Sequence, residues 1–196
     1  MSQFVTTRLS LLMRLRDSED SRAWEDFQSL YAPIIYRFGR RMGLQDADSI
    51  DLTQDVLVAV FQAIGSFEYD RQIGRFRGWL KTVAYHAFCA LKKRGNRVPT
   101  LDGSAAMSVA ELETAAKSDA RFWDDQYAQR LFDIAAERVR AKIKPTTWEV
   151  FVRTALKRQE PQAVANRLGL SVGNVYVAKA RVSAQVMDEL RELDES

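Results

Sequence analysis

The sequence predicts an all-α protein in which two small helical domains are joined by a flexible linker. Apolar residues recur at three- and four-residue spacing over most of the chain, and the alternating Val, Ile and Thr segments typical of strands are almost absent. Small and polar residues without an apolar stripe interrupt this pattern near the middle of the 196-residue chain. We therefore expect domains over residues 1–97 and 119–196, with a linker over residues 98–118.

The first helical run covers about residues 21–42. Asp20 or Ser21 can cap its first turn, and Gly43 is expected to end it. Pro33 lies inside the run, where a proline removes a backbone hydrogen bond and clashes with the preceding turn. We expect a kink or a break at this position.

The second run begins at Asp48 or Ser49 and ends at Gly65. Its apolar residues recur on one face, which is expected to be buried and to include Phe61. A third run begins near Arg75 after an intervening loop.

The third run ends at about residues 94–96, where the sequence becomes basic. Its spacing turns Phe76 and Trp79 toward the core, while Arg77 and Lys81 are predicted to face solvent.

After the linker, the pattern predicts a helix over about residues 122–143, which Pro145 ends. A further helix is expected from Thr146 or Thr147 to Leu156.

The last two helices have the spacing of a helix-turn-helix. Pro161 suits a first helical turn, Gly169 can adopt the left-handed conformation that ends a helix, and Ser171 can cap the next one. A DNA-binding helix-turn-helix places the start of its second helix in the major groove, although an ordinary helical hairpin has the same spacing. The side chains expected to be exposed at that start are Ser171, Asn174, Tyr176, Val177, Lys179 and Arg181.

Charge is distributed unevenly along the chain, although 29 basic and 26 acidic residues give a net charge of only +3. Residues 71–97 carry eight bases and no acid, and residues 142–187 carry eight bases and two acids. A basic run by itself is often a solvated helix face. Two basic blocks separated by acidic ones, the first containing aromatic rings, favour contact with a nucleic acid.

Composition argues against several other classes of protein. One Cys and one His exclude a disulfide scaffold and make a transition-metal site unexpected, and we predict no cofactor. His86 and Cys89 lack a neighbouring carboxylate to orient them, so we expect no catalytic site and no enzyme. Neither a membrane span nor a secretion signal is recognisable, so we expect a cytoplasmic protein.

Three stretches of the sequence carry a resemblance to a known family. Residues 48–61 read DSIDLTQDVLVAVF, residues 74–84 read GRFRGWLKTVA, and residues 168–175 read LGLSVGNV. In their order and spacing these motifs resemble the extracytoplasmic-function group of the sigma-70 family, the promoter-specificity subunits of bacterial RNA polymerase.

The resemblance implies a sigma factor that binds core RNA polymerase and directs promoter-specific initiation. Residues 1–97 would form the region 2 domain, which binds the polymerase and recognises and melts the −10 element. Residues 119–196 would form the region 4 domain, whose helix-turn-helix recognises the −35 element. The implied partners are core RNA polymerase and promoter DNA, both as duplex and as melted strand. Whether an anti-sigma protein also binds the chain is left open.

The resemblance also assigns roles to individual residues. The polymerase-binding surface would include Asp51, Gln54, Asp55 and Val58. Tyr85, His86 and Phe88 lie where the family reads a base extruded from the −10 element. The DNA backbone there would be held by Arg71, Arg75, Arg77, Lys81, Lys92, Lys93, Arg94 and Arg97. The −35 element would be contacted by the exposed residues of the second helix-turn-helix helix, 171–181, named above.

The chain departs from the family pattern at several of these positions. The family often has Asn in place of His86 and Asp in place of Ala90, and it commonly has basic residues in place of Tyr176 and Ala178. Base preference at the −10 element therefore stays open, and contacts to the −35 element are expected to depend more on Tyr176 and Asn174. The alternative function is a stand-alone helix-turn-helix repressor, which leaves the first basic block without a role.

Overall fold

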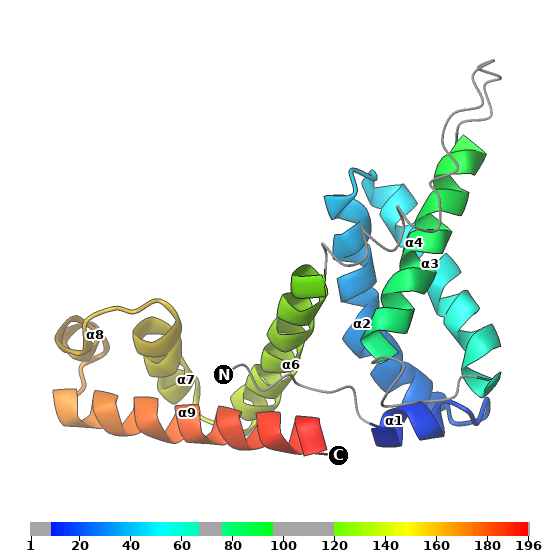
Figure 1. Cartoon of the computed structure of the whole chain (residues 1–196). Helices are drawn as coiled ribbons and strands as arrows, with labels where there is room; N and C mark the ends of the chain where they lie inside the picture. Colours follow the sequence, from blue (N-terminus) through cyan, green and yellow to red (C-terminus); the bar gives the residue numbers. More distant parts are fainter. Residues whose placement is uncertain (1–8, 67–75, 96–119, 196) are drawn as a thin grey trace. The chain divides into compact units, whose positions relative to one another are not determined.

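The computed structural model describes residues 9–66, 76–95 and 120–195, and these residues form helices and no strand (Figure 1). The all-α prediction is confirmed for them. The predicted linker, residues 98–118, lies outside the described residues. The chain divides into two compact units, Met1–Ala128 and Gln129–Ser196, which we call unit 1 and unit 2.

The described residues of unit 1 form four α-helices and the first turns of a further one. Helix α3 packs against both α2 and α4, and α1 packs against α2 (Figure 1). The elements are α1 (Leu9–Arg14), α2 (Ser21–Arg41), α3 (Asp46–Ala63) with a terminal 3₁₀ turn (Ile64–Ser66), α4 (Phe76–Gly95) and the beginning of α6 (Ala120–Lys142).

Local capping fixes both ends of α2. The backbone N–H of Ala23 donates to the Asp20 carboxylate at 2.9 Å, which satisfies one of the free donors of the first turn. Gly43 follows the other end with φ of 82°, a left-handed conformation that glycine adopts without strain. Both ends were predicted from the sequence.

Helix α2 continues through Pro33 without the break that we considered from the sequence. Leu30 and Tyr31 before the proline and Ile34 and Ile35 after it are all buried. Burying each such side chain stabilises the helix by about 1.5–3 kcal/mol, and together they offset the cost of about 3 kcal/mol for an internal proline.

Helices α2 and α3 approach closely at Gly39. A Cβ atom at this position would lie 3.1 Å from both Leu52 Cδ2 and Ser49 Oγ. The Ser49 hydroxyl is buried and donates to the Gln45 carbonyl at 2.8 Å, so it is not free to move aside. The absence of a side chain at residue 39 therefore sets the spacing between the two helices.

The core of unit 1 is aromatic. The Phe27 ring lies 4.9 Å from the Tyr31 ring and 6.0 Å from the Phe76 ring, measured between centroids. All three side chains are buried, as the sequence predicted for Phe76. Edge-to-face contacts of this kind stabilise a core beyond the burial of area alone.

Unit 2 contains the remainder of α6 and three further helical segments. These are α7 (Pro145–Phe151), which continues as a π-helical turn (Val152–Leu156), α8 (Pro161–Leu168) and α9 (Val172–Glu195). Val150, Val164, Ala165 and Val175 form the buried cluster that joins α7, α8 and α9.

Two helix starts differ from the sequence prediction. Helix α3 begins at Asp46 and not at Asp48 or Ser49, because acidic residues in a first turn are favoured by the helix dipole. Helix α7 begins at Pro145 and not at Thr146 or Thr147, because the fixed φ of proline suits the first helical position.

Within the described ranges, no helix combines the length and the apolar character needed to cross a membrane. The same residues contain no cluster of three or more His, Cys, Asp or Glu side chains placed to hold a metal ion.

Candidate functional site

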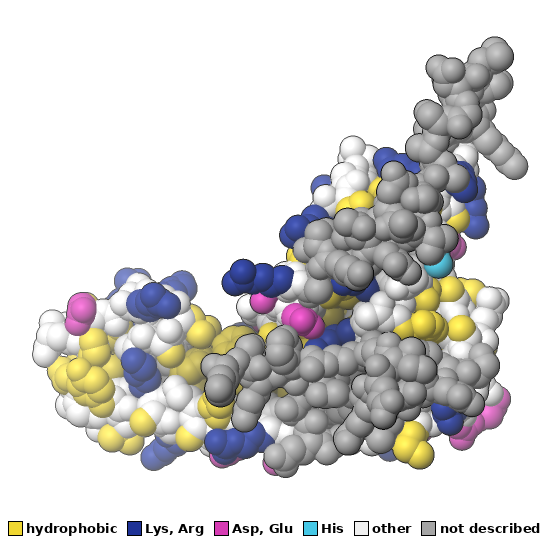
Figure 2. Space-filling view, in the orientation of Figure 1, with side chains coloured by type: hydrophobic (Ala, Val, Ile, Leu, Met, Phe, Trp, Pro, Cys, Tyr) yellow, Lys and Arg dark blue, Asp and Glu magenta, His cyan; other side chains and the backbone are white. Residues whose placement is uncertain are grey.

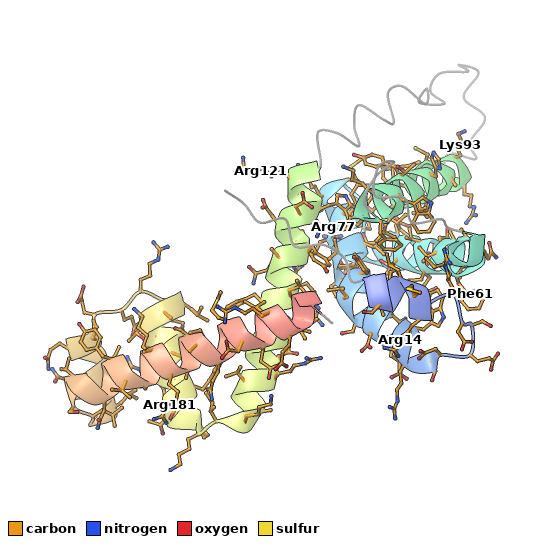
Figure 3. All side chains as sticks on the ribbon, turned by 60° about the horizontal axis from the view of Figure 1, so that its bottom comes forward. Arg14, Phe61, Arg77, Lys93, Arg121 and Arg181 are labelled. Carbon is orange, nitrogen blue, oxygen red and sulfur yellow. The ribbon has the colours of Figure 1, made fainter. Side chains whose placement is uncertain are left out.

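The C-terminal end of α4 is an exposed cationic tip, which we define as Lys92, Lys93 and Arg94 (Figure 3). Cationic side chains are stabilised at this end of a helix by the partial negative charge of the helix dipole. Lys92 Nζ lies 5.8 Å from the centroid of the Phe88 ring, close enough for a cation–π contact. Arg94 forms an exposed ion pair with Asp55 of α3 at 3.2 Å.

The candidate base-reading residues differ in exposure. His86 is exposed and is the cyan side chain in Figure 2, and Phe88 is half-buried. Tyr85, however, is only 2% exposed and packs edge-on against Phe38 with ring centroids 4.9 Å apart. In this conformation only His86 and part of Phe88 are available to a base.

The predicted outward orientation of Arg77 and Lys81 was wrong. Arg77 is 6% exposed and Lys81 is 7% exposed. Arg77 Nη2 lies 3.2 Å from an oxygen of Asp124, and its guanidinium carbon lies 4.5 Å from the centroid of the Tyr127 ring. Both partners belong to the first turns of α6, so the helical period within α4 could not reveal them (Figure 3).

Three predicted phosphate-binding residues, Arg71, Arg75 and Arg97, lie outside the described residues. Of the eight predicted, the structure therefore brings Lys92, Lys93 and Arg94 together at an accessible position.

The predicted polymerase-binding residues lie on one face of α3. Asp51, Gln54, Asp55 and Val58 are separated by three or four residues, which places them above one another on a helix. Asp51, Gln54 and Val58 are exposed and Asp55 is half-buried.

The sequence analysis missed the apolar part of this α3 face. Ile50 is 49% exposed and Phe61 is 51% exposed, although Phe61 was predicted to be buried. The Phe61 ring is supported on one side by Trp24 of α2, with centroids 5.0 Å apart. The exposure of a large aromatic side chain beside carboxylates is typical of a protein–protein contact.

The turn between α8 and α9 has the local chemistry that the sequence predicted. Gly169 adopts φ of 65°, and the backbone N–H of Asn174 donates to Ser171 Oγ at 3.2 Å. Leu168 and Leu170 pack against the buried cluster of Val150, Val164, Ala165 and Val175, which holds the turn in place.

The beginning of α9 presents polar and apolar groups together. Tyr176 and Val177 are each 57% exposed, and Ser171, Asn174 and Arg181 are also exposed. Lys179 is half-buried. The amide of Asn174 and the apolar surfaces of Tyr176 and Val177 suit the edges and methyl groups of bases in the major groove.

The far end of α9 is fixed to α6 by a buried carboxylate. Glu189 is 8% exposed and pairs with Lys142 and with Arg138, the latter at 3.6 Å. The hydrogen bond from Lys142 lowers the pKa of Glu189 below its ordinary value. No sequence pattern indicates the contact between Lys142 and Glu189, because the two residues lie 47 positions apart.

The sequence of this chain is similar to those of known proteins. The sequence pattern of the family described as Sigma-70 region 2 matches residues 27–98, which contain most of α2 and all of α3 and α4. RNA polymerase sigma factor CnrH of Cupriavidus metallidurans is 27% identical over 171 residues, which cover 85% of this chain and 88% of CnrH. ECF RNA polymerase sigma factor SigE of Mycolicibacterium smegmatis is 28% identical over 76 residues, covering 39% of this chain and 28% of SigE. The chain belongs to the extracytoplasmic-function group of sigma-70 factors.

This sigma factor accordingly acts with RNA polymerase in transcription initiation, and its family is not a family of enzymes. The solved structure of CnrH in complex with the cytosolic domain of CnrY covers 93% of this chain and 96% of that chain, at 22% identity and a TM-score of 0.38.

Proposed function

We propose that this sigma factor recognises and melts promoter DNA in the cytoplasm, with residues 1–97 acting as region 2 and residues 119–196 as region 4. The observation that carries this proposal is the exposed cationic tip of α4, which lies within the segment that matches Sigma-70 region 2. Helix α4 itself contains no carboxylate, and Asp55 of α3 pairs with Arg94 of the tip at 3.2 Å.

For the −10 element, the cationic tip holds the DNA backbone while His86 and Phe88 receive an extruded base. Arg71, Arg75 and Arg97 extend the same phosphate contacts in this proposal. Stacking of a base on an aromatic side chain is worth about 1–3 kcal/mol, which offsets much of the cost of unstacking it. His86 can form one hydrogen bond with that base and Ala90 none, so His86 is the residue expected to influence base choice.

For the polymerase, the α3 face supplies carboxylates and an apolar centre. We extend the contact set of Asp51, Gln54, Asp55 and Val58 to Phe61, because the support from Trp24 holds the Phe61 ring at the surface. A complementary partner surface would carry cations around an apolar pocket.

For the −35 element, α8 and α9 act as the helix-turn-helix and α9 enters the major groove. Asn174 can form a bidentate pair with adenine, and Tyr176 and Val177 can contact thymine methyl groups. In this proposal, Ser171, Lys179 and Arg181 hold the phosphates of the −35 element. An anti-sigma protein as a further partner stays a prediction.

The test is run-off transcription from a promoter library with core RNA polymerase, in the presence and absence of this sigma factor. Initiation at a distinct subset of promoters, only when the sigma factor is present, is the expected result. Sequence-specific repression without any core-dependent initiation would support the stand-alone repressor and would contradict the proposal.

A further inference from the structure

Three aromatic side chains from residues 120–128 of α6 pack on the rest of unit 1. Trp123 and Tyr127 are 2% and 1% exposed, and their rings lie 5.5 Å from Phe38 and 5.8 Å from Tyr31 respectively. Phe122 lies beneath the Arg41 guanidinium, at 4.7 Å from its ring centroid. We call residues 120–128 the α6 cover.

Polar groups of the α6 cover contact two further arginines. Asp124 pairs with Arg77 at 3.2 Å, and Arg77 also lies over the ring of Tyr127. Arg37 Nη1 donates to the side-chain oxygen of Gln126 at 2.8 Å. Three guanidinium groups of α2 and α4, those of Arg37, Arg41 and Arg77, are therefore engaged by the cover.

The groups on the cover have the chemistry of a nucleic-acid strand. The Asp124 carboxylate contacts an arginine as a phosphate oxygen would, and the Gln126 side-chain oxygen accepts a hydrogen bond as a base carbonyl would. The Phe122 ring lies beneath a guanidinium as a stacked base would. The surface beneath the cover combines arginines with the rings of Tyr31 and Phe38, which is the composition of a single-strand binding site.

We propose that the α6 cover occupies a second binding surface for single-stranded DNA on α2 and α4, and that it must leave for the strand to bind there. This inference rests on the proposed function, in which unit 1 binds melted promoter DNA. It explains why Arg77, which belongs to an acid-free basic block, is buried against Asp124 and Tyr127.

The contacts between the α6 cover and the rest of unit 1 include one that opposes the closed arrangement. Burial of Trp123 and Tyr127 favours the closed arrangement, but the Trp123 Nε1–H is buried without a hydrogen-bond partner among the described residues. When only a small fraction of molecules is open, the apparent affinity for the strand falls by that fraction. Weakening the cover should therefore tighten DNA binding.

The first experiment measures binding of a short fluorescein-labelled single-stranded DNA of mixed sequence to the full chain by anisotropy. Asp124→Asn removes the charge that pairs with Arg77, and we expect it to tighten binding about fivefold. Asp125→Asn is the matched control, because Asp125 is exposed on the same helix and the change in net charge is identical. Equal effects of the two variants, or no effect of Asp124→Asn, would overturn the proposal.

The second experiment closes the cover permanently. Arg37→Cys and Gln126→Cys are combined with Cys89→Ser, and the two new thiols are joined by a short bis-maleimide. The cross-linked protein should bind the same DNA about tenfold more weakly than the same variant treated with N-ethylmaleimide. Unchanged affinity after cross-linking would contradict the proposal.

The two failures can be told apart by run-off transcription with the unmodified chain. If it supports initiation with core polymerase but neither experiment changes DNA binding, the inference about the cover is wrong and the proposed function stands. If the unmodified chain does not support initiation, the proposed function itself fails.

Discussion

The two ends of α4 carry similar charges and have opposite surroundings. At its beginning, Arg77 and Lys81 are buried. At its end, Lys92, Lys93 and Arg94 are exposed. The difference teaches that a run of basic residues in a sequence does not show which of its charges are accessible, because tertiary contacts decide which of them a partner can reach.

The largest expected effect contrasts two phenylalanines on α4. Phe76→Ala should lower the free energy of unfolding of unit 1 by about 3–5 kcal/mol, because the ring is buried in the aromatic core and its loss leaves a cavity. Phe88→Ala, at a half-buried position, is the control and should cost clearly less. Urea unfolding of both variants measures the difference, and similar losses would show that the end of α4 is as tightly packed as its beginning.

The next contrast concerns the charges themselves. Arg77→Ala removes the ion pair with Asp124 and the contact with Tyr127, and we expect a loss of about 1–3 kcal/mol in the free energy of unfolding. Lys93→Ala removes an exposed charge and should change stability by less than about 0.5 kcal/mol. If the Arg77→Ala protein is as stable as the wild type, the buried charge at the beginning of α4 contributes no more to stability than the exposed charges at its end.

The third contrast separates charge from base recognition in the complex with core polymerase. The double variant Lys92→Ala with Lys93→Ala should weaken binding to all promoter sequences. The slope of the logarithm of the binding constant against the logarithm of the salt concentration should become shallower by up to about two. Asn174→Ala should leave the slope nearly unchanged and alter sequence preference at the −35 element by about 1–3 kcal/mol. Both are measured by titrating labelled promoters at several salt concentrations, and an unchanged slope in the double lysine variant would exclude those lysines from the interface.

The smallest effect concerns the ion pair between Arg14, at the end of α1, and Asp20, the cap that precedes α2. The hydrogen bond from Arg14 and that from the Ala23 N–H lower the pKa of Asp20 from 3.8 to about 2. Because the folded pKa lies below the unfolded one, this contribution to stability is present above pH 4 and is lost as the pH falls toward 2. Asp20→Asn should therefore show a shallower loss of thermal stability between pH 5 and pH 2 than the wild type, and parallel profiles would contradict this assignment.

Sequence reasoning succeeded where a structure depends on neighbours along the chain. The Asp20 cap, the left-handed Gly43 and Gly169 and the cap at Ser171 follow from the local chemistry of each residue. Helical periodicity likewise predicted the all-α class and the burial of Phe76.

It failed where the deciding contact comes from a distant segment. The burial of Arg77 depends on Asp124 and Tyr127, and no pattern within α4 records those partners. Phe61 has the spacing of a core residue, but Trp24 covers only one side of its ring. The roles of the predicted contact residues depend on partners outside the chain and stay predictions.

The missing side chain at Gly39 has a consequence for how this sequence can diverge. Leu52 Cδ2 and Ser49 Oγ lie 3.1 Å from the position that a Cβ atom would take, which is closer than ordinary van der Waals contact. In a descendant that acquires alanine at residue 39, either a smaller residue at position 49 or 52 relieves the close contact, or α3 with its surface residues shifts by a few tenths of an ångström away from α2. These three positions should therefore covary among its descendants, with small residues exchanged between the two helices.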